Sequence, residues 1–273
     1  MKKNISTLIL IFVFLVGLSL LLYPTVSNYW NSLHQTRAIA DYTEAVADID
    51  NTMYETMWTD AEEYNRELLW NENRYIMSDA QRETYEGLLN VSGNGIMGYI
   101  EIPGIQCFLP IYHGTDATVL QVAVGHIEGS SLPVGGKGTH VALSGHRGLP
   151  SAKLFTNLDK LVVGDVFMLR VLDEVLTYEV DQILIVEPQE MEALDIDEEQ
   201  DYCTLITCTP YGVNSHRLLV RGHRTDNLEE ARTIRVTADA LQIDPVLVAP
   251  IVAAPMLVIL LVILLIRTGR KRK

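Results

Sequence analysis

Two long apolar runs without a charged residue, one near each end of the chain, limit most strongly what this sequence can fold into. Residues 5–23 and 246–266 are 19 and 21 residues long, and about 20 apolar residues span a bilayer core as a helix. The part between them has the mixed composition of a folded soluble domain. The sequence therefore predicts a domain tethered to a membrane at both ends and excludes a polytopic transporter.

The distribution of charge predicts the orientation of this domain. All 35 Asp and Glu lie between the two runs, with 14 of the 21 Lys and Arg, so the middle part carries a net charge of −21. The other seven basic residues lie in the tails 1–4 and 267–273. Because cytoplasmic flanks collect Lys and Arg, both termini are expected inside and the middle outside. A charge of −21 repels phosphates and argues against nucleic acid as a partner.

Each run has an alternative interpretation. The first has a basic start and resembles a signal peptide, but it exceeds the usual 7–15-residue apolar core, and residues 23–28 offer no A-x-A-like cleavage site. The second contains Pro250 and Pro255, which kink a membrane helix without forbidding it. A buried core helix is its alternative, and the basic tail 267–273 favours a membrane span instead.

The region 24–92 between the first run and the β-rich part is predicted to be helical. Apolar residues at three- and four-residue steps indicate one helix face: Ile39, Tyr42, Val46, Ile49, Met53 and Met57. Residues 71–77 interrupt the pattern, and Ser78 with Gln81 fits a capping box that opens a helix toward Leu89.

Short β-rich runs separated by Gly and Pro follow over residues 93–225. The predicted strands are Ile96–Ile102, Gln106–Tyr112, Thr139–Ser144, Val166–Val171, Leu176–Val186, Cys203–Cys208 and Leu218–Arg221. Such a series of short strands indicates a sandwich or a barrel. Ser151–Leu158 and Glu190–Leu194 are predicted as short inserted helices, and a helical linker, residues 226–245, leads to the second apolar run.

The three cysteines include one candidate nucleophile. An odd number of cysteines in an extracellular domain leaves at least one free thiol unless chains cross-link. Cys208 ends a predicted strand just before Pro210, where side chains face clefts, and strand alternation places it on the face opposite Cys203. The alternative for Cys208, as for any isolated cysteine, is that of a small, inert core residue.

A nucleophilic thiol needs a base or a cation nearby. Six histidines are candidates: His113, His126, His140, His146, His216 and His223. His146 follows an apolar strand and Gly145, although position alone does not separate it from His126. Arg217 opens the next strand after Cys208, so its guanidinium can return to the same sheet end and stabilise an oxyanion. A surface arginine paired with a carboxylate is the alternative.

Three blocks of sequence together carry a family resemblance. Residues 204–222, TLITCTPYGVNSHRLLVRG, resemble the signature of class C sortases, the pilin-polymerising branch of that family. Residues 142–155, ALSGHRGLPSAKLF, resemble the block around the catalytic histidine of these enzymes. GYIEIP at 98–103 and LPIYHGT at 109–115 resemble their first strands, and the likeness extends from about Tyr85 to Arg224.

This resemblance implies a mainly β protein, an eight-stranded sortase barrel with short inserted helices, and a membrane cysteine transpeptidase of Gram-positive bacteria. It implies Cys208 as nucleophile, His146 as general acid/base and Arg217 as the oxyanion or substrate-positioning residue, with no metal or organic cofactor. The implied partners are pilin precursors with an LPxTG-like signal and an acceptor lysine. A cysteine hydrolase and a housekeeping sortase that attaches proteins to cell-wall precursors remain alternatives; a non-catalytic adhesin is disfavoured, because all three residues are present.

Class C sortases commonly cover the active site with a lid bearing an Asp-Pro-aromatic motif. The corresponding stretch here keeps Asp79 but has Ala80 and Gln81 in the next two positions. Asp79 could still pair with Arg217, and Tyr75 or Met77 could replace the missing ring. Because Ser78–Gln81 fits a helix cap better, a weak or absent lid is predicted.

Overall fold

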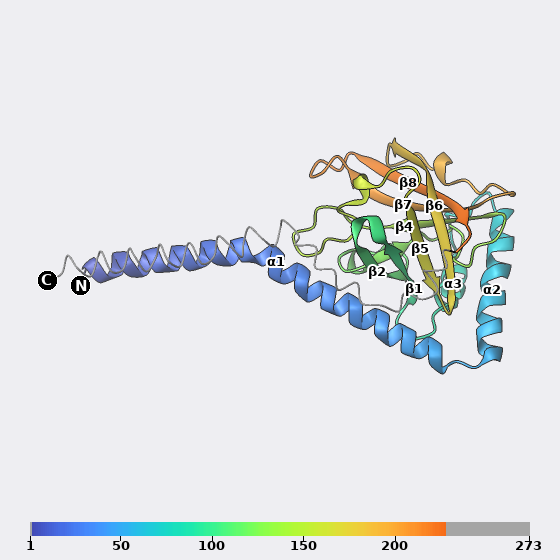
Figure 1. The fold of residues 1–273 in the computed structure, drawn as a ribbon, viewed down its shortest axis with the longest axis horizontal. Coiled ribbons are helices and arrows are strands. Elements are labelled where there is room, and N and C mark those ends of the chain that lie inside the picture. Colours follow the sequence, from blue (N-terminus) through green and yellow to red (C-terminus); the bar gives the residue numbers. More distant parts are fainter. Residues whose placement is uncertain (1, 228–273) are drawn as a thin grey trace. The chain divides into compact units, whose positions relative to one another are not determined.

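The computed structural model describes residues 2–227 (Figure 1). The predicted second span 246–266, the tail 267–273 and nearly all of the linker 226–245 lie outside the described residues. The chain divides into two compact units, and the first boundary between them follows Trp30.

A long first helix, α1 (Lys2–Asp48), covers the predicted N-terminal span and continues beyond it with Pro24 in its interior. The part from Ile9 to Asp48 contains an 18-residue window with a mean hydropathy of 2.5, none of it buried in the protein. By length and composition this helix is able to cross a membrane. Within the second unit, the predicted face of α1 packs on the barrel through Ile39, Tyr42 and Val46, all of them buried.

Two shorter helices complete the helical region. The side chain of Asp50 caps α2 (Asn51–Leu69) by accepting from the Met53 amide. After the predicted interruption, Ser78 and Gln81 form the predicted capping box at the start of α3 (Asp79–Gly87). Met57 packs against the core as predicted, but Met53 is about half exposed because the chain breaks between α1 and α2 and the periodicity does not run through.

Eight strands close into a barrel in the order β1-β2-β3-β4-β7-β8-β6-β5. They are β1 (Ile96–Ile102), β2 (Cys107–His113), β3 (Val124–His126), β4 (Thr139–Ser144), β5 (Val166–Val171), β6 (Glu174–Val186), β7 (Asp201–Thr209) and β8 (His216–Thr225). The pairs β2–β3 and β4–β7 are parallel and the other pairs are antiparallel. The barrel predicted from the family resemblance is confirmed.

Short helical turns connect the strands. They are η1 (Pro103–Ile105), α4 (Ala117–Leu120), η2 (Leu158–Lys160) and η3 (Glu192–Leu194). The helix predicted over Ser151–Leu158 is wrong: Leu154 has a positive φ of 37°, and the Phe155 amide donates back to the carbonyl of His146. The segment folds back on the end of β4 and buries Ala152, Leu154 and Phe155. The helix predicted over Glu190–Leu194 is only the short η3 turn.

The register of β4 and β7 determines what meets at each end of the barrel. The two strands run in parallel from Thr139 beside Asp201 to Ser144 beside Ile206. Their carboxyl ends therefore lie at one end of the barrel, and β8, antiparallel to β7, begins there. We call this the carboxyl end of the β4–β7 pair and the other the amino end.

Candidate active site

Cys208 lies in the carboxyl-terminal part of β7 and is half-buried, with its Cα opposite that of Arg217 in β8. Residues directly opposite in an antiparallel pair have Cβ atoms about 4.5–5.5 Å apart and point to the same face. The thiol and the base of the arginine side chain are therefore neighbours. The position of Cys208 agrees with the predicted strand end.

His146 reaches the same end from β4. Ser144 pairs with Ile206, so His146, two residues past the end of β4, follows at the end of the barrel where Cys208 lies. Two hydrogen bonds extend the pairing past the strand: the Gly145 amide donates to the Ile206 carbonyl at 3.0 Å, and the Thr207 hydroxyl donates to the Gly145 carbonyl at 2.7 Å. His146 itself is half-buried, so its ring is within reach of solvent and substrate.

Arg217 contacts backbone oxygens and no carboxylate. Its Nη1 atom donates to the carbonyl oxygens of Asn214, at 3.3 Å, and His216, at 3.2 Å. Among the ion pairs within residues 2–227, none involves Arg217. The loop carbonyls orient this guanidinium, and its positive charge is not paired with a carboxylate of residues 2–227. It can therefore stabilise a developing oxyanion.

Two other candidate histidines, His126 and His140, are buried and serve the core. The Tyr85 hydroxyl lies 2.9 Å from Nδ1 of His126, and the Ser131 carbonyl 2.8 Å from its Nε2. The Asp195 carbonyl and the Thr204 hydroxyl hold the two ring nitrogens of His140. Burial lowers the pKa of each imidazole to about 4. Of the two candidates that sequence position did not separate, His126 is fully buried, whereas His146 is half-buried at the end of the barrel that holds Cys208.

The remaining cysteines are poor nucleophiles. Burial raises the pKa of the Cys107 thiol to about 12, with the charge of Lys153 acting weakly in the opposite sense. Burial also raises the pKa of Cys203 well above its usual value. Because the thiolate is the attacking form, both thiols are held in the unreactive state.

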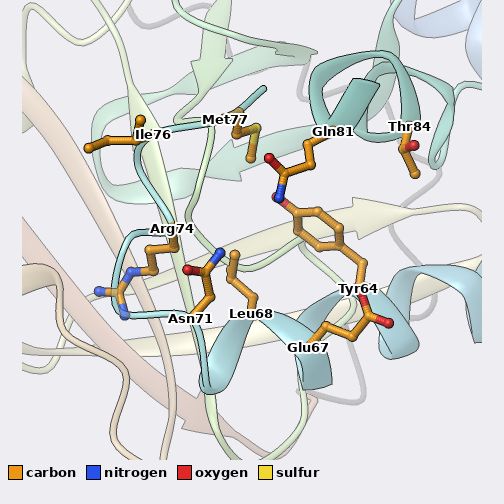
Figure 2. Close-up of a pocket in the computed structure, with 9 residues that line it drawn as sticks. All are labelled: Tyr64, Glu67, Leu68, Asn71, Arg74, Ile76, Met77, Gln81 and Thr84. Atoms are coloured by element: carbon orange, nitrogen blue, oxygen red, sulfur yellow. The ribbon is translucent and has the colours of Figure 1, made fainter. Parts of the chain in front are cut away.

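The segment compared with a lid packs near the amino end of the β4–β7 pair. Arg74 donates to the Leu194 carbonyl at 3.0 Å and pairs with Asp195, whose own carbonyl holds His140. His146 follows His140 by six positions along β4 and just past its end, about 20 Å at ~3.3 Å per residue. Figure 2 shows Met77 and Gln81 at a hollow between α2 and α3 that Tyr64 and Leu68 also line.

Asp79, the residue considered for a lid, is exposed in the first turn of α3. No ion pair joins it to Arg217 within the part of the chain that the structure describes. The same part contains no group of three or more His, Cys, Asp and Glu residues arranged to hold a metal ion. The chemistry available at this end of the barrel is thus that of a thiol, an imidazole and a guanidinium.

Sequence reasoning missed two neighbours of this trio. Arg147, next to His146, lies with its guanidinium carbon 5.7 Å from the ring centre of Tyr211, in the loop after Cys208. The spacing of 64 positions gives no local signal for such a contact, although both residues stand in the two blocks that carry the family resemblance.

Comparison with known proteins places this fold in a family. The model of the sortase domain matches residues 100–225. Sortase D of Bacillus subtilis is 32% identical over 130 residues, which are 46% of this chain and 63% of that protein, so the chain spans a little under two thirds of its length.

Solved structures extend the likeness beyond the barrel. The crystal structure of sortase C1 from Streptococcus agalactiae is 50% identical with a TM-score of 0.69, covering 70% of this chain and all of the other. Sortase C of Streptococcus pneumoniae is 43% identical with a TM-score of 0.62, covering 70% of this chain and 97% of that one. The chain belongs to the sortase family. Within the family it is structurally similar to class C enzymes.

Proposed function

We propose that this protein is a pilin-joining sortase that cleaves an LPxTG-like signal between Thr and Gly and links the new acyl group to a lysine of another pilin. The observation that carries this proposal is the pairing of Cys208 with Arg217 across the β7–β8 ladder, with His146 at the same end. The class C likeness supports the pilin substrate, since the pneumococcal structure is described in terms of pilin substrate specificity.

The first half of the reaction forms a thioester. The Cys208 thiolate attacks the threonine carbonyl carbon, and Arg217 donates hydrogen bonds to the resulting oxyanion. When the tetrahedral intermediate collapses, the C–N bond to glycine breaks and His146 supplies the proton that the amine takes away. A half-buried thiol beside a half-buried imidazole suits both steps, because substrate and leaving group need access.

The second half transfers the acyl group. A lysine ε-amine attacks the thioester, His146 removes its proton, and the Cys208 thiolate leaves as an isopeptide bond forms. No redox partner is required, since each bond broken is replaced by one formed. Water resolving the same thioester gives a hydrolase, and a cell-wall precursor amine gives the housekeeping reaction, so only the acceptor distinguishes the three.

The predicted topology fits a substrate that emerges from the membrane. We place both termini in the cytoplasm and residues 24–245 outside, with 5–23 and 246–266 as the two spans. The catalytic barrel 93–225 then stands outside the cell, where a pilin precursor carrying its sorting signal is accessible.

An acceptor competition tests the proposal. The full-length protein in detergent is incubated with an LPxTG peptide together with a pilin-derived lysine peptide, and the products are separated by mass spectrometry. We expect a conjugate containing both peptides. A matched lysine-to-arginine acceptor gives no conjugate, and Cys208→Ala gives no turnover. Release of the free acid alone would show hydrolysis, whereas transfer only to a cell-wall-type amine such as oligoglycine would show the housekeeping reaction.

A further inference from the structure

The strand pairing that aligns the two catalytic loops ends before the catalytic side chains. The last bonds between the β4 and β7 arms are made by Gly145 and Thr207, each one residue before His146 and Cys208 respectively. Past these two bonds, no backbone hydrogen bond joins the loop after β4 to the loop after β7 within residues 2–227. A contact between the two loops beyond this point is made by side chains.

Arg147 and Tyr211 supply such a contact. The Arg147 guanidinium lies over the Tyr211 ring at 5.7 Å from its centre, within the range of a cation–π interaction. The same ring lies against the backbone at Gly148, where a Cβ atom would come within 2.8 Å of Tyr211 Cε2. Gly148 also has a φ of +74°, so glycine suits this position for both reasons.

A second contact joins the arginine to the turn η2. Its Nη2 atom pairs with Asp159 of η2, a turn whose neighbouring Leu158 is fully buried. The Arg147 side chain is 10% exposed, and its Nε is buried without a hydrogen-bond partner among the described residues. A surface ion pair alone does not account for this placement, because burying an unpaired N–H is costly.

We propose that Arg147 and Tyr211 form a latch that holds the loop after His146 against the loop after Cys208, and so fixes the distance between imidazole and thiol. Both are positioning residues, since they act through their neighbours. This inference concerns the thiol–imidazole chemistry of the proposed function and rests on it. A small change in that separation lowers the rate of proton transfer without altering the groups that bind the substrate.

The two contributions of the latch can be separated by substitution. Tyr211→Ala removes the ring, Tyr211→Phe keeps it, and Arg147→Lys keeps the charge but loses the planar group that stacks. Val213→Ala is the matched control, because Val213 belongs to the same loop and is 70% exposed. Tyr211 is itself 61% exposed, so its truncation leaves the core intact, and a thermal melt of each variant verifies this.

The measurements are kcat and KM of the full-length protein for the LPxTG peptide. We expect kcat to fall about 10-fold in Tyr211→Ala and in Arg147→Lys, with KM within about twofold. The double variant should fall no further, because both changes open one latch. Tyr211→Phe and Val213→Ala should retain kcat within about twofold. Multiplicative losses in the double variant, an effect confined to KM, or equal losses in Tyr211→Phe and Tyr211→Ala would overturn the latch.

A second readout is independent of the substrate. The rate at which iodoacetamide alkylates Cys208 is followed by peptide mass spectrometry in the same five variants. Tyr211→Ala and the double variant should change this rate equally, by about threefold or more, and Tyr211→Phe should not. An unchanged rate in Tyr211→Ala contradicts the latch. Failure of the LPxTG peptide with the unmodified protein would instead count against the proposed function and leave this readout valid.

Discussion

β7 carries a cysteine toward each end, and β4 and the loop after it carry a histidine toward each end, yet the residues at the two ends behave differently. At the amino end His140 lies in β4 and Cys203 in β7, both buried. At the carboxyl end His146 and Cys208 are half-buried. The chemistry of the side chains is identical, so their surroundings account for the difference.

At the amino end, His140 and Cys203 are buried and serve the packing of the barrel. Hydrogen bonds hold both nitrogens of His140, and burial lowers its pKa to about 4. Burial also raises the pKa of Cys203 well above its usual value. At the carboxyl end the β4–β7 pairing stops at Gly145 and Thr207, while β7 still pairs with β8, and both Cys208 and His146 are half-buried. The comparison teaches that burial and hydrogen bonding, more than residue type, decide which histidine and cysteine are accessible for a reaction.

The largest effect is expected from removing the thiol at one end or the other. Cys208→Ala and Cys208→Ser should abolish thioester formation, because no other described thiol has an arginine opposite it in the ladder. Cys203→Ala and Cys107→Ala should retain most of the activity. Intact-mass detection of the acyl-enzyme with an LPxTG peptide measures this directly.

The control for this prediction is a stability measurement. Cys203→Ala removes a fully buried group and should lower the melting temperature somewhat, whereas Cys208→Ala should change it less. Loss of the acyl-enzyme in a folded Cys203→Ala protein would contradict the assignment of Cys208 as the nucleophile.

Arg217→Lys should have the next largest effect, although it keeps the charge. An ammonium cannot reproduce two planar donors, and losing one oxyanion donor typically costs about 10²–10³ in rate. The measurement is kcat/KM for the LPxTG peptide. Arg221→Lys is the control, since Arg221 lies farther along β8 and pairs with Asp181 of β6. Near-full turnover in Arg217→Lys would show that Arg217 has a structural role and does not stabilise the oxyanion.

Much of the barrel follows from sequence, because its strands are short, β-rich and bounded by Gly and Pro. The ranges Ile96–Ile102, Thr139–Ser144 and Val166–Val171 agree with the structure to the residue. Strand β3 was not predicted, because three residues that include a glycine leave no alternation to detect. The helix predicted at 151–158 was wrong since its apolar residues pack on the barrel from a turn held by Phe155 and His146.

The site itself is predictable only in part. Strand ends and the family blocks indicate Cys208, His146 and Arg217, and their grouping depends on a parallel pairing between strands about 60 residues apart. The contact of Arg147 with Tyr211 depends on loop conformations with positive φ at Gly148 and Leu154, which hydrophobic periodicity does not encode. Local patterns therefore yield the elements and the reactive residues, while the side-chain contacts that align them require the fold.

Acidification should destabilise the fold through the two buried histidines. The pKa of His126 and of His140 is lowered to about 4 in the folded protein, against about 6.5 when unfolded. Between these values the unfolded chain binds more protons, so stability is complete above pH ~6.5 and falls as pH drops toward 4. The loss is at most about 3 kcal/mol for each histidine.

Urea unfolding of the full-length protein at pH 7 and pH 4.5 measures this loss. Carboxylates contribute to the same pH range, so the comparison is between variants. His140→Gln keeps a hydrogen-bonding amide but cannot be protonated, and the pH dependence of its unfolding free energy should be shallower than that of the unmodified protein. His126→Asn should have a similar effect at its own site. Equal slopes in all three proteins would contradict the argument.

The smallest effect is expected from Asp79, which tests whether the amino-end helices guard the carboxyl-end site. Asp79 is exposed in the first turn of α3, where its charge favours the helix start, and the segment before it contacts Asp195 near His140. Asp79→Ala should therefore change the rate of Cys208 alkylation by less than about threefold, under ~1 kcal/mol. Ser78→Ala is the matched control, because it removes the capping box and should lower stability by about 1 kcal/mol with little effect on Cys208. A much faster alkylation of Cys208 in Asp79→Ala alone would show that Asp79 covers the thiol in solution. That result would contradict the separation of the α3 segment from the carboxyl end of the β4–β7 pair.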